Sequence, residues 1–241
     1  MTPRQLQRLA RWGSFAISLS WSLLILAALL PGAKAAEAIP RAAHGYRADL
    51  TRQARQVWGL DAPVATFAAQ IHTESLWRPD AVSPVGARGL TQFMPATEAW
   101  IAGVYPELNT SREPVSGAAA SGSAAPAGAM NPTWAIRALV TYDKWLWDRI
   151  RAADDCQRMA MVLSSYNGGL GWLQKDQRLA RSAPGQGLGS ADLSMRWFDG
   201  VERFNAGRSA AAFRENRAYP RLILKVREPL YQAAGWGGRS C

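Results

Sequence analysis

The chain has 241 residues, 48% of them hydrophobic, and contains no heptad or solenoid repeat. This length and composition are typical of a globular domain with a hydrophobic core and argue against a coiled coil or a repeat protein. The formal net charge of +10 predicts affinity for polyanions such as nucleic acid, anionic lipid or an acidic cell wall, although such a charge can also serve solubility alone.

The first 35 residues have the three regions of a secretory signal. Arg4, Arg8 and Arg11 precede an apolar run over residues 15–30, and an A-x-A cleavage site follows at 33–35. Because the apolar run is nearly long enough to span a membrane, an uncleaved N-terminal anchor is the alternative. No cysteine near the site is available to carry a lipid anchor. We therefore expect the protein to be exported.

Export changes which polyanion the positive charge is expected to bind. Four of the 28 basic residues and none of the 18 acidic residues lie in the first 35 positions, so the remainder carries a net charge of +6. Export makes nucleic acid the least expected polyanion, and the sequence has no recognition-helix or RNA-binding signature. We predict no nucleic-acid partner.

Hydrophobic spacing predicts two helices in the next part of the chain. The first covers residues 46–58 and ends at the glycine that follows. Asp61 is placed to cap the second helix, and Pro63 suits its first turn. Apolar residues then recur at helical spacing over 64–71, and we expect this pattern to end at Pro79.

The middle of the chain is rich in turn-forming residues. Glycine and proline recur over 83–95, and residues 105–132 are rich in Ala, Gly, Ser and Pro. We interpret 105–132 as a long loop or an insertion within the domain. Asn131 and Pro132 then signal the start of a helix that runs to about residue 150.

Two further helices are predicted toward the C-terminus. Asp154 can cap the first of them, with Gln157 placed to reach back as in a capping box, and the pair Gly168-Gly169 ends it. The second is expected from Pro220 to Glu228, bent or ended by Pro229. No alternating strand pattern is convincing, so we predict a mostly α-helical fold.

Glu74 is an acidic residue that follows a largely apolar segment. It follows Phe67 and Ile71 at steps of seven and three, so its carboxyl continues the helical stripe that should face the core. An apolar environment raises the pKa of a carboxyl group, and an acid that keeps its proton near neutral pH can protonate a leaving-group oxygen. The alternative is that the stripe has ended and Glu74 lies in solvent at the helix terminus.

Four segments together resemble a known family. They are ES at 74–75, AVSPVGARGLTQFMP at 81–95, SYNGG at 165–169 and ENRAY at 215–219. In this order they resemble the soluble lytic transglycosylase catalytic domain, the peptidoglycan-cleaving branch of the lysozyme superfamily. The resemblance implies a mostly α, lysozyme-like domain of the goose type with a catalytic cleft, over residues 43–241, in the periplasm.

The resemblance also implies roles for single residues. Glu74 corresponds to the one catalytic acid and base. The residues that would line the substrate groove around it are Ser75, Gln92, Met94, Tyr166, Asn167, Glu215 and Tyr219. The chain departs from the family pattern in four places. Thr91 replaces a usual Met, Asn216 replaces a Thr, and Gly169-Leu170-Gly171 replaces a usual Ala-Gly-Pro-Gly turn. The helix after Pro132 lacks the family's usual Asn and Gly, with Ala135 and Leu139 nearby instead.

The implied reaction cleaves the β-1,4 bond between N-acetylmuramic acid and N-acetylglucosamine in peptidoglycan glycan strands and forms a 1,6-anhydro-muramic end. Near Glu74 the sequence offers Asp80 and, more distantly, Glu98 as further carboxylates, and neither belongs to a motif. A single strong carboxylate favours lytic transfer over hydrolysis. The alternatives are a muramidase that adds water, and a non-catalytic wall-binding component of an envelope-spanning secretion or conjugation complex.

Other residue types leave alternatives open. Cys156 and Cys241 could pair in an oxidising compartment, or remain a buried hydrophobe and a free thiol. Two histidines and two cysteines scattered along the chain do not form a zinc pattern, so we expect no metal and no cofactor. Trp77 and Trp100 flank the motif block and are candidates for stacking on sugar rings, the alternative being core positions.

Overall fold

The computed structural model describes residues 37–109, 128–183 and 192–241. The predicted signal at 1–35 and the central part of the predicted insertion lie outside these residues. No helix within the described ranges has both the length and the apolar character needed to cross a membrane.

The described chain folds into two compact units. The Glu74 unit comprises residues 37–144 and 222–240, and the Tyr166 unit comprises residues 145–221 together with Cys241. No β-strand forms within the described ranges, where residues 82, 88 and 93 make isolated bridges instead. The prediction of a mostly helical fold is confirmed.

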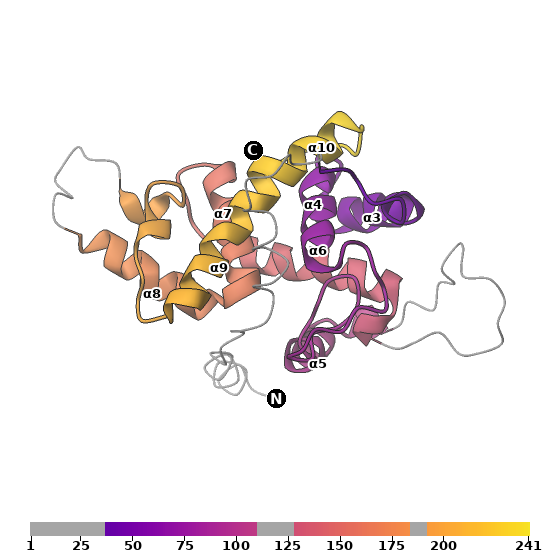
Figure 1. Cartoon of the computed structure of the whole chain (residues 1–241), viewed down its shortest axis with the longest axis horizontal. Helices are drawn as coiled ribbons and strands as arrows, with labels where there is room; N and C mark the ends of the chain where they lie inside the picture. Colours follow the sequence, from indigo (N-terminus) through magenta and orange to yellow (C-terminus); the bar gives the residue numbers. More distant parts are fainter. Residues whose placement is uncertain (1–36, 110–127, 184–191) are drawn as a thin grey trace. The chain divides into compact units, whose positions relative to one another are not determined.

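The Glu74 unit is organised around one buried helix. Helix α4 (Val64–Ser75) begins with small and apolar residues and is buried along nearly all of its length, Gln70 and His72 included. It packs against α3, against the π turn η6 and against α10 (Figure 1). The elements of this unit are α3 (Ala43–Trp58), α4, α5 (Pro95–Val104), η2 (Pro106–Asn109), η3 (Gly128–Met130), most of α6 (Pro132–Trp147), η6 (Leu222–Arg227) and α10 (Glu228–Ala233).

The start of α4 corrects one prediction. Asp61 does not cap this helix, whose N-cap position is Pro63 without a side-chain hydrogen bond. The free amide of Ala65 instead donates to the carbonyl of Gly238 at 3.0 Å. A distant backbone segment therefore satisfies the helix start, which is the role that an Asp side chain would otherwise have.

The end of α4 also differs from expectation. The helix stops at Ser75 and not at Pro79, because Leu76 and Trp77 both have left-handed backbone angles, with φ of 54° and 63°. Two successive non-glycine residues with positive φ are uncommon. The chain therefore turns immediately after Glu74 and Ser75.

In the Tyr166 unit α7 (Asp155–Gly168) packs against both α8 (Leu170–Arg181) and α9 (Ala210–Arg221) (Figure 1). Asp154 caps α7 by accepting from the amide of Gln157 at 2.8 Å, as predicted. The side chain of Gln157 does not reach back, which corrects the capping-box prediction. It accepts instead from the amides of Trp197 and Phe198 at 2.8 and 2.9 Å. The short turns of this unit are η4 (Leu193–Met195) and η5 (Val201–Arg203).

The predicted last helix is wrong. Pro220 does not begin a helix but lies near the end of α9, which starts ten residues earlier, at Ala210. A wider π turn follows over Leu222–Arg227 before α10. A proline inside a helix removes one backbone hydrogen bond, and a local change of helical pitch is a common way to accommodate it.

The two cysteines are joined by a disulfide bond. Cys156, in the first turn of α7, pairs with Cys241 across a Cα–Cα distance of 4.7 Å. Of the two alternatives left open by the sequence, pairing is confirmed.

Candidate functional site

Glu74 is the penultimate residue of α4. Its side chain is half-buried, whereas Phe67 and Ile71 on the same stripe are fully buried. The carboxyl therefore lies where the apolar stripe reaches the surface, between the two alternatives that the sequence allowed.

Ser75 supports the turn behind Glu74. Its side chain is fully buried, and its hydroxyl oxygen accepts from the amide of Arg78 at 3.2 Å. The Arg78 Nε also donates to the carbonyl of Ser75 at 3.1 Å. The hydroxyl is thus used inside the protein, where it fixes the direction in which the chain leaves α4.

Residues 81–93 form a closed loop held by its own backbone. Ser83 accepts from the amide of Ala87 through its hydroxyl at 2.9 Å, and the amide of Gly89 donates to the carbonyl of Ala81 at 2.8 Å. Gln92 has a left-handed φ of 50°, and its Nε2 donates to the carbonyls of Ala81 and Gly89 at 3.1 and 2.9 Å. Gln92 therefore locks the loop, while its buried Oε1 has no hydrogen-bond partner among the described residues.

This loop also contacts the last part of the predicted insertion at 105–132. A side chain at Gly89 would place its Cβ 1.9 Å from the carbonyl oxygen of Ala129, so the two backbones touch directly. Glu98 on α5 accepts from the amide of Ala129 at 3.1 Å. Met94, half-buried, occupies the N-cap position of α5. The predicted groove residues Gln92 and Met94 are thus held on a rigid frame.

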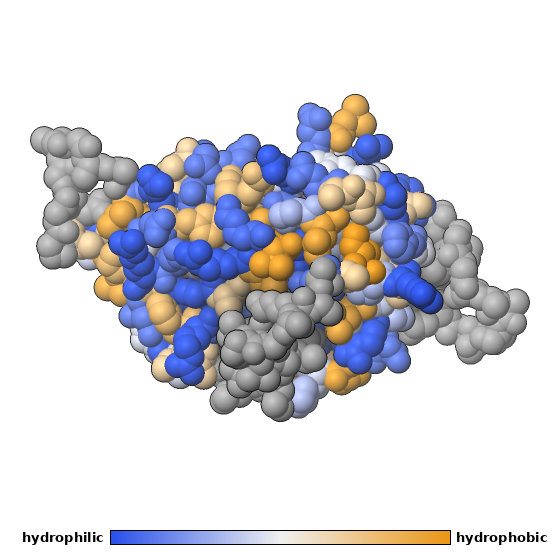
Figure 2. Space-filling model, turned by 45° about the horizontal axis from the view of Figure 1, so that its top comes forward, coloured by the Kyte–Doolittle hydropathy of each residue, from blue (hydrophilic) through white to orange (hydrophobic). Residues whose placement is uncertain are grey.

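Apolar side chains are exposed next to this frame. Val82 is 61% exposed, and Leu76 and Val85 are more than a third exposed. On the face of the molecule drawn in Figure 2, hydrophobic residues lie interspersed among hydrophilic ones.

The two tryptophans predicted as candidates for stacking on sugar rings differ in burial. Trp77 is fully buried, and its Nε1 donates to the hydroxyl of Tyr231 at 2.6 Å, so it cannot stack on a sugar. It belongs to an aromatic core with Tyr231 and Trp236, whose ring centroids are 5.0 Å apart. Trp100 is half-buried with its ring edge against Tyr142, and its stacking role stays a prediction.

Asp143 on α6 is a carboxyl near Glu74 that sequence reasoning missed. Its side chain is fully buried, and burial together with the nearby charge of Glu74 raises its pKa well above the usual range, partly offset by Gln70. No motif marks Asp143, but its position three residues after Val140 on the buried side of α6 could have drawn attention to it. By contrast, Asp80 is exposed.

The other predicted residues belong to the Tyr166 unit. Tyr166 and Tyr219 are buried, and Asn167 and Glu215 are half-buried. Burial raises the pKa of Glu215, and a hydrogen bond with Asn167 partly offsets this. Asn167 and Glu215, from α7 and α9, are therefore brought together.

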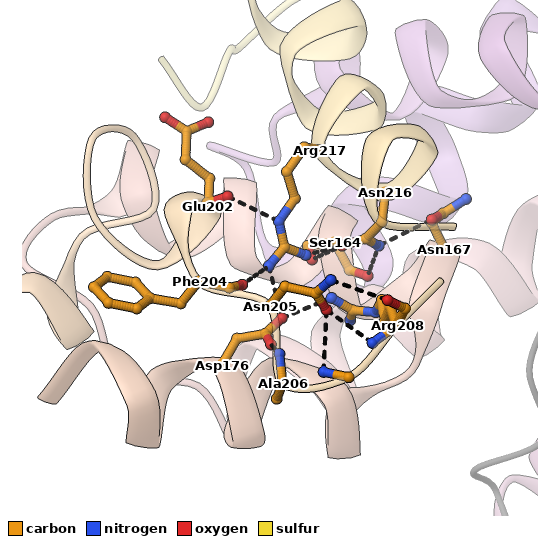
Figure 3. A network of polar contacts seen from close by, with 11 residues as sticks. Ser164, Asn167, Asp176, Glu202, Phe204, Asn205, Ala206, Arg208, Asn216 and Arg217 are labelled. Atoms are coloured by element: carbon orange, nitrogen blue, oxygen red, sulfur yellow. Dashed lines mark hydrogen bonds and ion pairs between the residues drawn. The ribbon is translucent and has the colours of Figure 1, made fainter. Parts of the chain in front are cut away.

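Asn216 explains the departure from the family pattern. It is buried, and its Nδ2 donates to Asn167 Oδ1 and to the carbonyl of Ser164, both at 2.9 Å (Figure 3). Its Oδ1 accepts from the Ser164 hydroxyl at 2.9 Å and from Arg217 Nη1 at 2.6 Å. An amide at this position can thus both donate and accept, which holds Asn167 in one orientation.

A buried ion cluster lies behind this contact (Figure 3). Asp176 Oδ2 accepts from Arg208 Nη1 at 2.6 Å and from Arg217 Nη2 at 2.7 Å. All three side chains are at most 10% exposed. Asp176 fixes Arg217, which in turn holds Asn216, so the orientation of Asn167 depends on a carboxylate three contacts away. Within the described residues, no group of three or more Cys, His, Asp or Glu side chains is arranged to hold a metal ion.

Comparisons with known proteins agree with the motifs. The chain matches the Transglycosylase SLT domain family over residues 49–187, a range that contains Glu74 and Tyr166 but not Glu215. Among the solved structures that match is the 70 kDa soluble lytic transglycosylase from Escherichia coli, with 19% sequence identity and a TM-score of 0.49. That match covers 81% of this chain and 25% of the other, so the chain spans about a quarter of that protein's length. No curated protein matches the chain.

Proposed function

Because the chain belongs to the transglycosylase SLT domain family, we propose that it is an exported peptidoglycan lytic transglycosylase that uses Glu74 as both acid and base. The observation that carries this proposal is the half-buried carboxyl of Glu74 at the end of a buried helix, beside the loop that Gln92 locks. Partial exposure leaves this carboxyl accessible to a substrate.

In the proposed mechanism Glu74 first protonates the glycosidic oxygen between N-acetylmuramic acid and N-acetylglucosamine. An oxocarbenium-like centre develops at C1 of the muramic residue, assisted by its own N-acetyl group. Glu74, now a carboxylate, then removes the proton from the 6-hydroxyl of the same sugar, whose oxygen closes the 1,6-anhydro ring. The nucleophile is already part of the substrate, so proximity takes the place of a bound water.

We assign the remaining predicted residues to two roles. Ser75 shapes the turn after Glu74, since its hydroxyl is used within that turn. Contact with the glycan is assigned to Gln92, Met94, Tyr166, Asn167, Glu215 and Tyr219. For Gln92 the assignment is supported by its Oε1, which has no hydrogen-bond partner among the described residues. This oxygen can accept from an N–H or O–H group of the substrate.

A muramidase that adds water is the second candidate function, and Asp143 is the observation that favours it. Ordinary glycosidases use two carboxyl groups, and Asp143 is a second carboxyl near Glu74. However, Asp143 is fully buried, so it cannot reach a sugar carbon or a bulk water molecule directly. This burial supports lytic transfer as the first choice.

Two observations support export to the periplasm. The first is the signal-like sequence at 1–35, and the second is the bond between Cys156 and Cys241, since disulfides persist mainly in oxidising compartments. The net charge of +6 outside the signal suits an anionic wall. A partnership with an envelope-spanning secretion or conjugation complex is a further proposal, which a pull-down from envelope extracts would test.

The first experiment is to incubate purified residues 36–241 with isolated peptidoglycan sacculi, beside the variant Glu74→Gln, and to identify soluble products by mass spectrometry. Products lighter by one water than hydrolytic fragments, and absent with the variant, would support lytic transfer with Glu74 as its acid and base. Reducing ends that depend on Glu74 would identify a muramidase. Wall binding without cleavage would favour a non-catalytic wall-binding component.

A further inference from the structure

Glu98, in the first turn of α5, is a carboxylate that joins two segments of the backbone. Its side chain is half-buried, and its Oε1 accepts from the amide of Ala129 at 3.1 Å. A Cβ added to the neighbouring Gly128 would overlap this oxygen, so the carboxyl lies directly against the backbone of η3. The hydrogen-bonding capacity of Glu98 is therefore used inside the protein, between α5 and η3.

The turn η3 is held from two sides. On one side the amide of Asn131 donates to the carbonyl of Gly128 at 2.9 Å, and the side chain of Asn131 caps α6. On the other side Glu98 holds the amide of Ala129. The carbonyl of Ala129 is thus fixed between the start of α6 and the first turn of α5.

This carbonyl lies against the loop that contains Gln92. A Cβ on Gly89 would overlap the carbonyl oxygen of Ala129, so the two backbones are in direct contact. The carbonyl of Gly89 in turn accepts from Gln92 Nε2 at 2.9 Å, and the amide of Gly89 donates to the carbonyl of Ala81 at 2.8 Å. An unbroken series of contacts therefore leads from Glu98 through Ala129 and Gly89 to Gln92.

The conformation of Gln92 needs support from its surroundings. Its φ of 50° is uncommon for a residue other than glycine, and such a backbone persists only where neighbouring groups hold it. Its buried Oε1 has no hydrogen-bond partner among the described residues. Strained backbone and an unused buried acceptor are both more frequent at functional positions than elsewhere. A loop that relaxed would release the strain at Gln92 and change the direction of this acceptor.

We propose that Glu98 is a positioning residue for glycan binding, which holds Ala129 against Gly89 and thereby keeps Gln92 in the conformation that binds the glycan. The inference rests on the proposed function, because that function assigns Gln92 to glycan contact. In this role Glu98 transfers no proton and needs only an oxygen that accepts a hydrogen bond. The carboxylate of Glu98 thus serves binding, while that of Glu74 serves the chemistry.

The first experiment measures kcat and KM on a soluble glycan fragment of peptidoglycan. We expect Glu98→Ala to raise KM about five- to tenfold through the lost hydrogen bond, with kcat within about twofold of the wild type because Glu74 is unchanged. Glu98→Gln should keep KM within about twofold, since its amide oxygen can accept the same bond. Asp80→Ala, which removes an exposed carboxylate, should change neither constant.

Two results would overturn the inference. An unchanged KM in Glu98→Ala would show that the contact with Ala129 does not affect binding. A large loss of kcat in Glu98→Gln would show that the carboxylate takes part in the reaction itself. Glu98→Asp, which keeps the charge but is one carbon shorter, should raise KM as well, and it carries the test if thermal unfolding shows that Glu98→Ala does not fold.

A double-mutant cycle tests whether Glu98 acts through Gln92. Substitutions that affect the same contact are not additive. Glu98→Ala should therefore raise KM by less than about twofold when it is introduced into Gln92→Ala, although it raises KM more in the wild type. The same increase in both backgrounds would mean that Glu98 affects another part of the groove, and would refute the series of contacts as the cause.

A further measurement needs no activity. Hydrogen exchange at the amide of Gly89, followed by NMR, reports how often the loop opens. We expect exchange about fivefold faster in Glu98→Ala than in the wild type, and unchanged in Glu98→Gln. An equal rate in all three proteins would refute the role of Glu98 even in a protein that cleaves peptidoglycan. Faster exchange in a protein that cleaves nothing would support this role of Glu98 in the loop and refute only the proposed function.

Discussion

At the scale of single residues, the loop after Glu74 depends on a glycine that touches another backbone. Gly89 has φ of 71°, and a Cβ there would lie 1.9 Å from the carbonyl oxygen of Ala129. Gly86, in the same loop, has φ of 87°, but a methyl group added there would meet nothing within 4 Å. Substitutions at Gly86 and Gly89 therefore separate the effect of backbone conformation on stability from the effect of close contact.

We expect Gly86→Ala to lower the free energy of unfolding by about 1–2 kcal/mol, because a side chain strains the left-handed conformation. Gly89→Ala should cost this amount and a further 1–3 kcal/mol, roughly, because the methyl group also forces two backbone segments apart. Denaturant unfolding of both variants measures the difference. Equal costs would mean that the contact with Ala129 does not constrain the loop.

The ion cluster behind Asn216 gives a second prediction at this scale. Asp176→Asn leaves Arg208 and Arg217 buried without their carboxylate, and breaking a buried pair in this way typically costs about 3–5 kcal/mol. The control Asp199→Asn removes a carboxylate that is 75% exposed and should change stability by less than about 0.5 kcal/mol. Thermal unfolding compares the two, and similar small losses would show that Asp176 is replaceable.

Sequence reasoning at this scale succeeded where spacing or a motif marked a residue. The position of Glu74 at the end of a buried stripe followed from helical spacing. Asp143 was missed because no motif marks it and the groups that influence its carboxyl, Gln70 and Glu74, lie far away in the sequence. For Trp77 the core position that the sequence left open is confirmed, and spacing could not decide it because its partner Tyr231 is 154 residues away.

At the scale of elements, α4 contains a histidine that links its packing to pH. His72 is 2% exposed, and its Nε2 lies 3.7 Å from Glu37 Oε1, which also pairs with Arg227. Burial, together with the charge of Arg227, lowers the pKa of His72 from 6.5 to about 4, and Glu37 only partly offsets this. His72 is therefore neutral in the folded protein at neutral pH.

The unfolded chain binds a proton at His72 near pH 6.5, whereas the folded protein binds it only near pH 4. Stability is thus complete above pH 6.5 and falls as the pH drops through this window, by about 3 kcal/mol in total. His72→Gln should remove this part of the pH dependence, and the exposed His44→Gln should not. Denaturant unfolding at pH 7, 5.5 and 4 tests this, and parallel losses in all three proteins would exclude His72 as the cause.

The start of a helix was predictable where a side chain close in the sequence caps it. Asn131 caps α6 by accepting from the amide of Trp134 at 3.1 Å, and Asp154 caps α7, as their positions in the sequence indicated. The prediction that Asp61 caps α4 was wrong, because the carbonyl of Gly238 accepts the hydrogen bond from the amide of Ala65 at the start of this helix. The helix α8 was not predicted at all, because it begins directly after the Gly168-Gly169 pair that ends α7.

At the scale of the whole molecule, segments that are far apart in the sequence belong to the same compact unit. Residues 222–240 return to the Glu74 unit, where Tyr231 and Trp236 complete the aromatic core around Trp77. The family motifs are divided as well, with Glu74 and Gln92 in one unit and Tyr166 and Glu215 in the other. Such long-range groupings follow from packing and are not visible in hydrophobic spacing.

The bond between Cys156 and Cys241 is the one covalent cross-link in the chain, because these are its only cysteines. It joins residues 85 positions apart, and in the chain-entropy model a closed loop of this size stabilises the folded state by about 4–5 kcal/mol. Reduction should therefore lower the denaturant midpoint of the wild type. A reductant should have no effect on the double variant Cys156→Ser with Cys241→Ser, which should already unfold at the lower midpoint. If the oxidised and reduced proteins unfold together, the cross-link does not contribute to stability, and the compartment in which it forms would matter little to the fold.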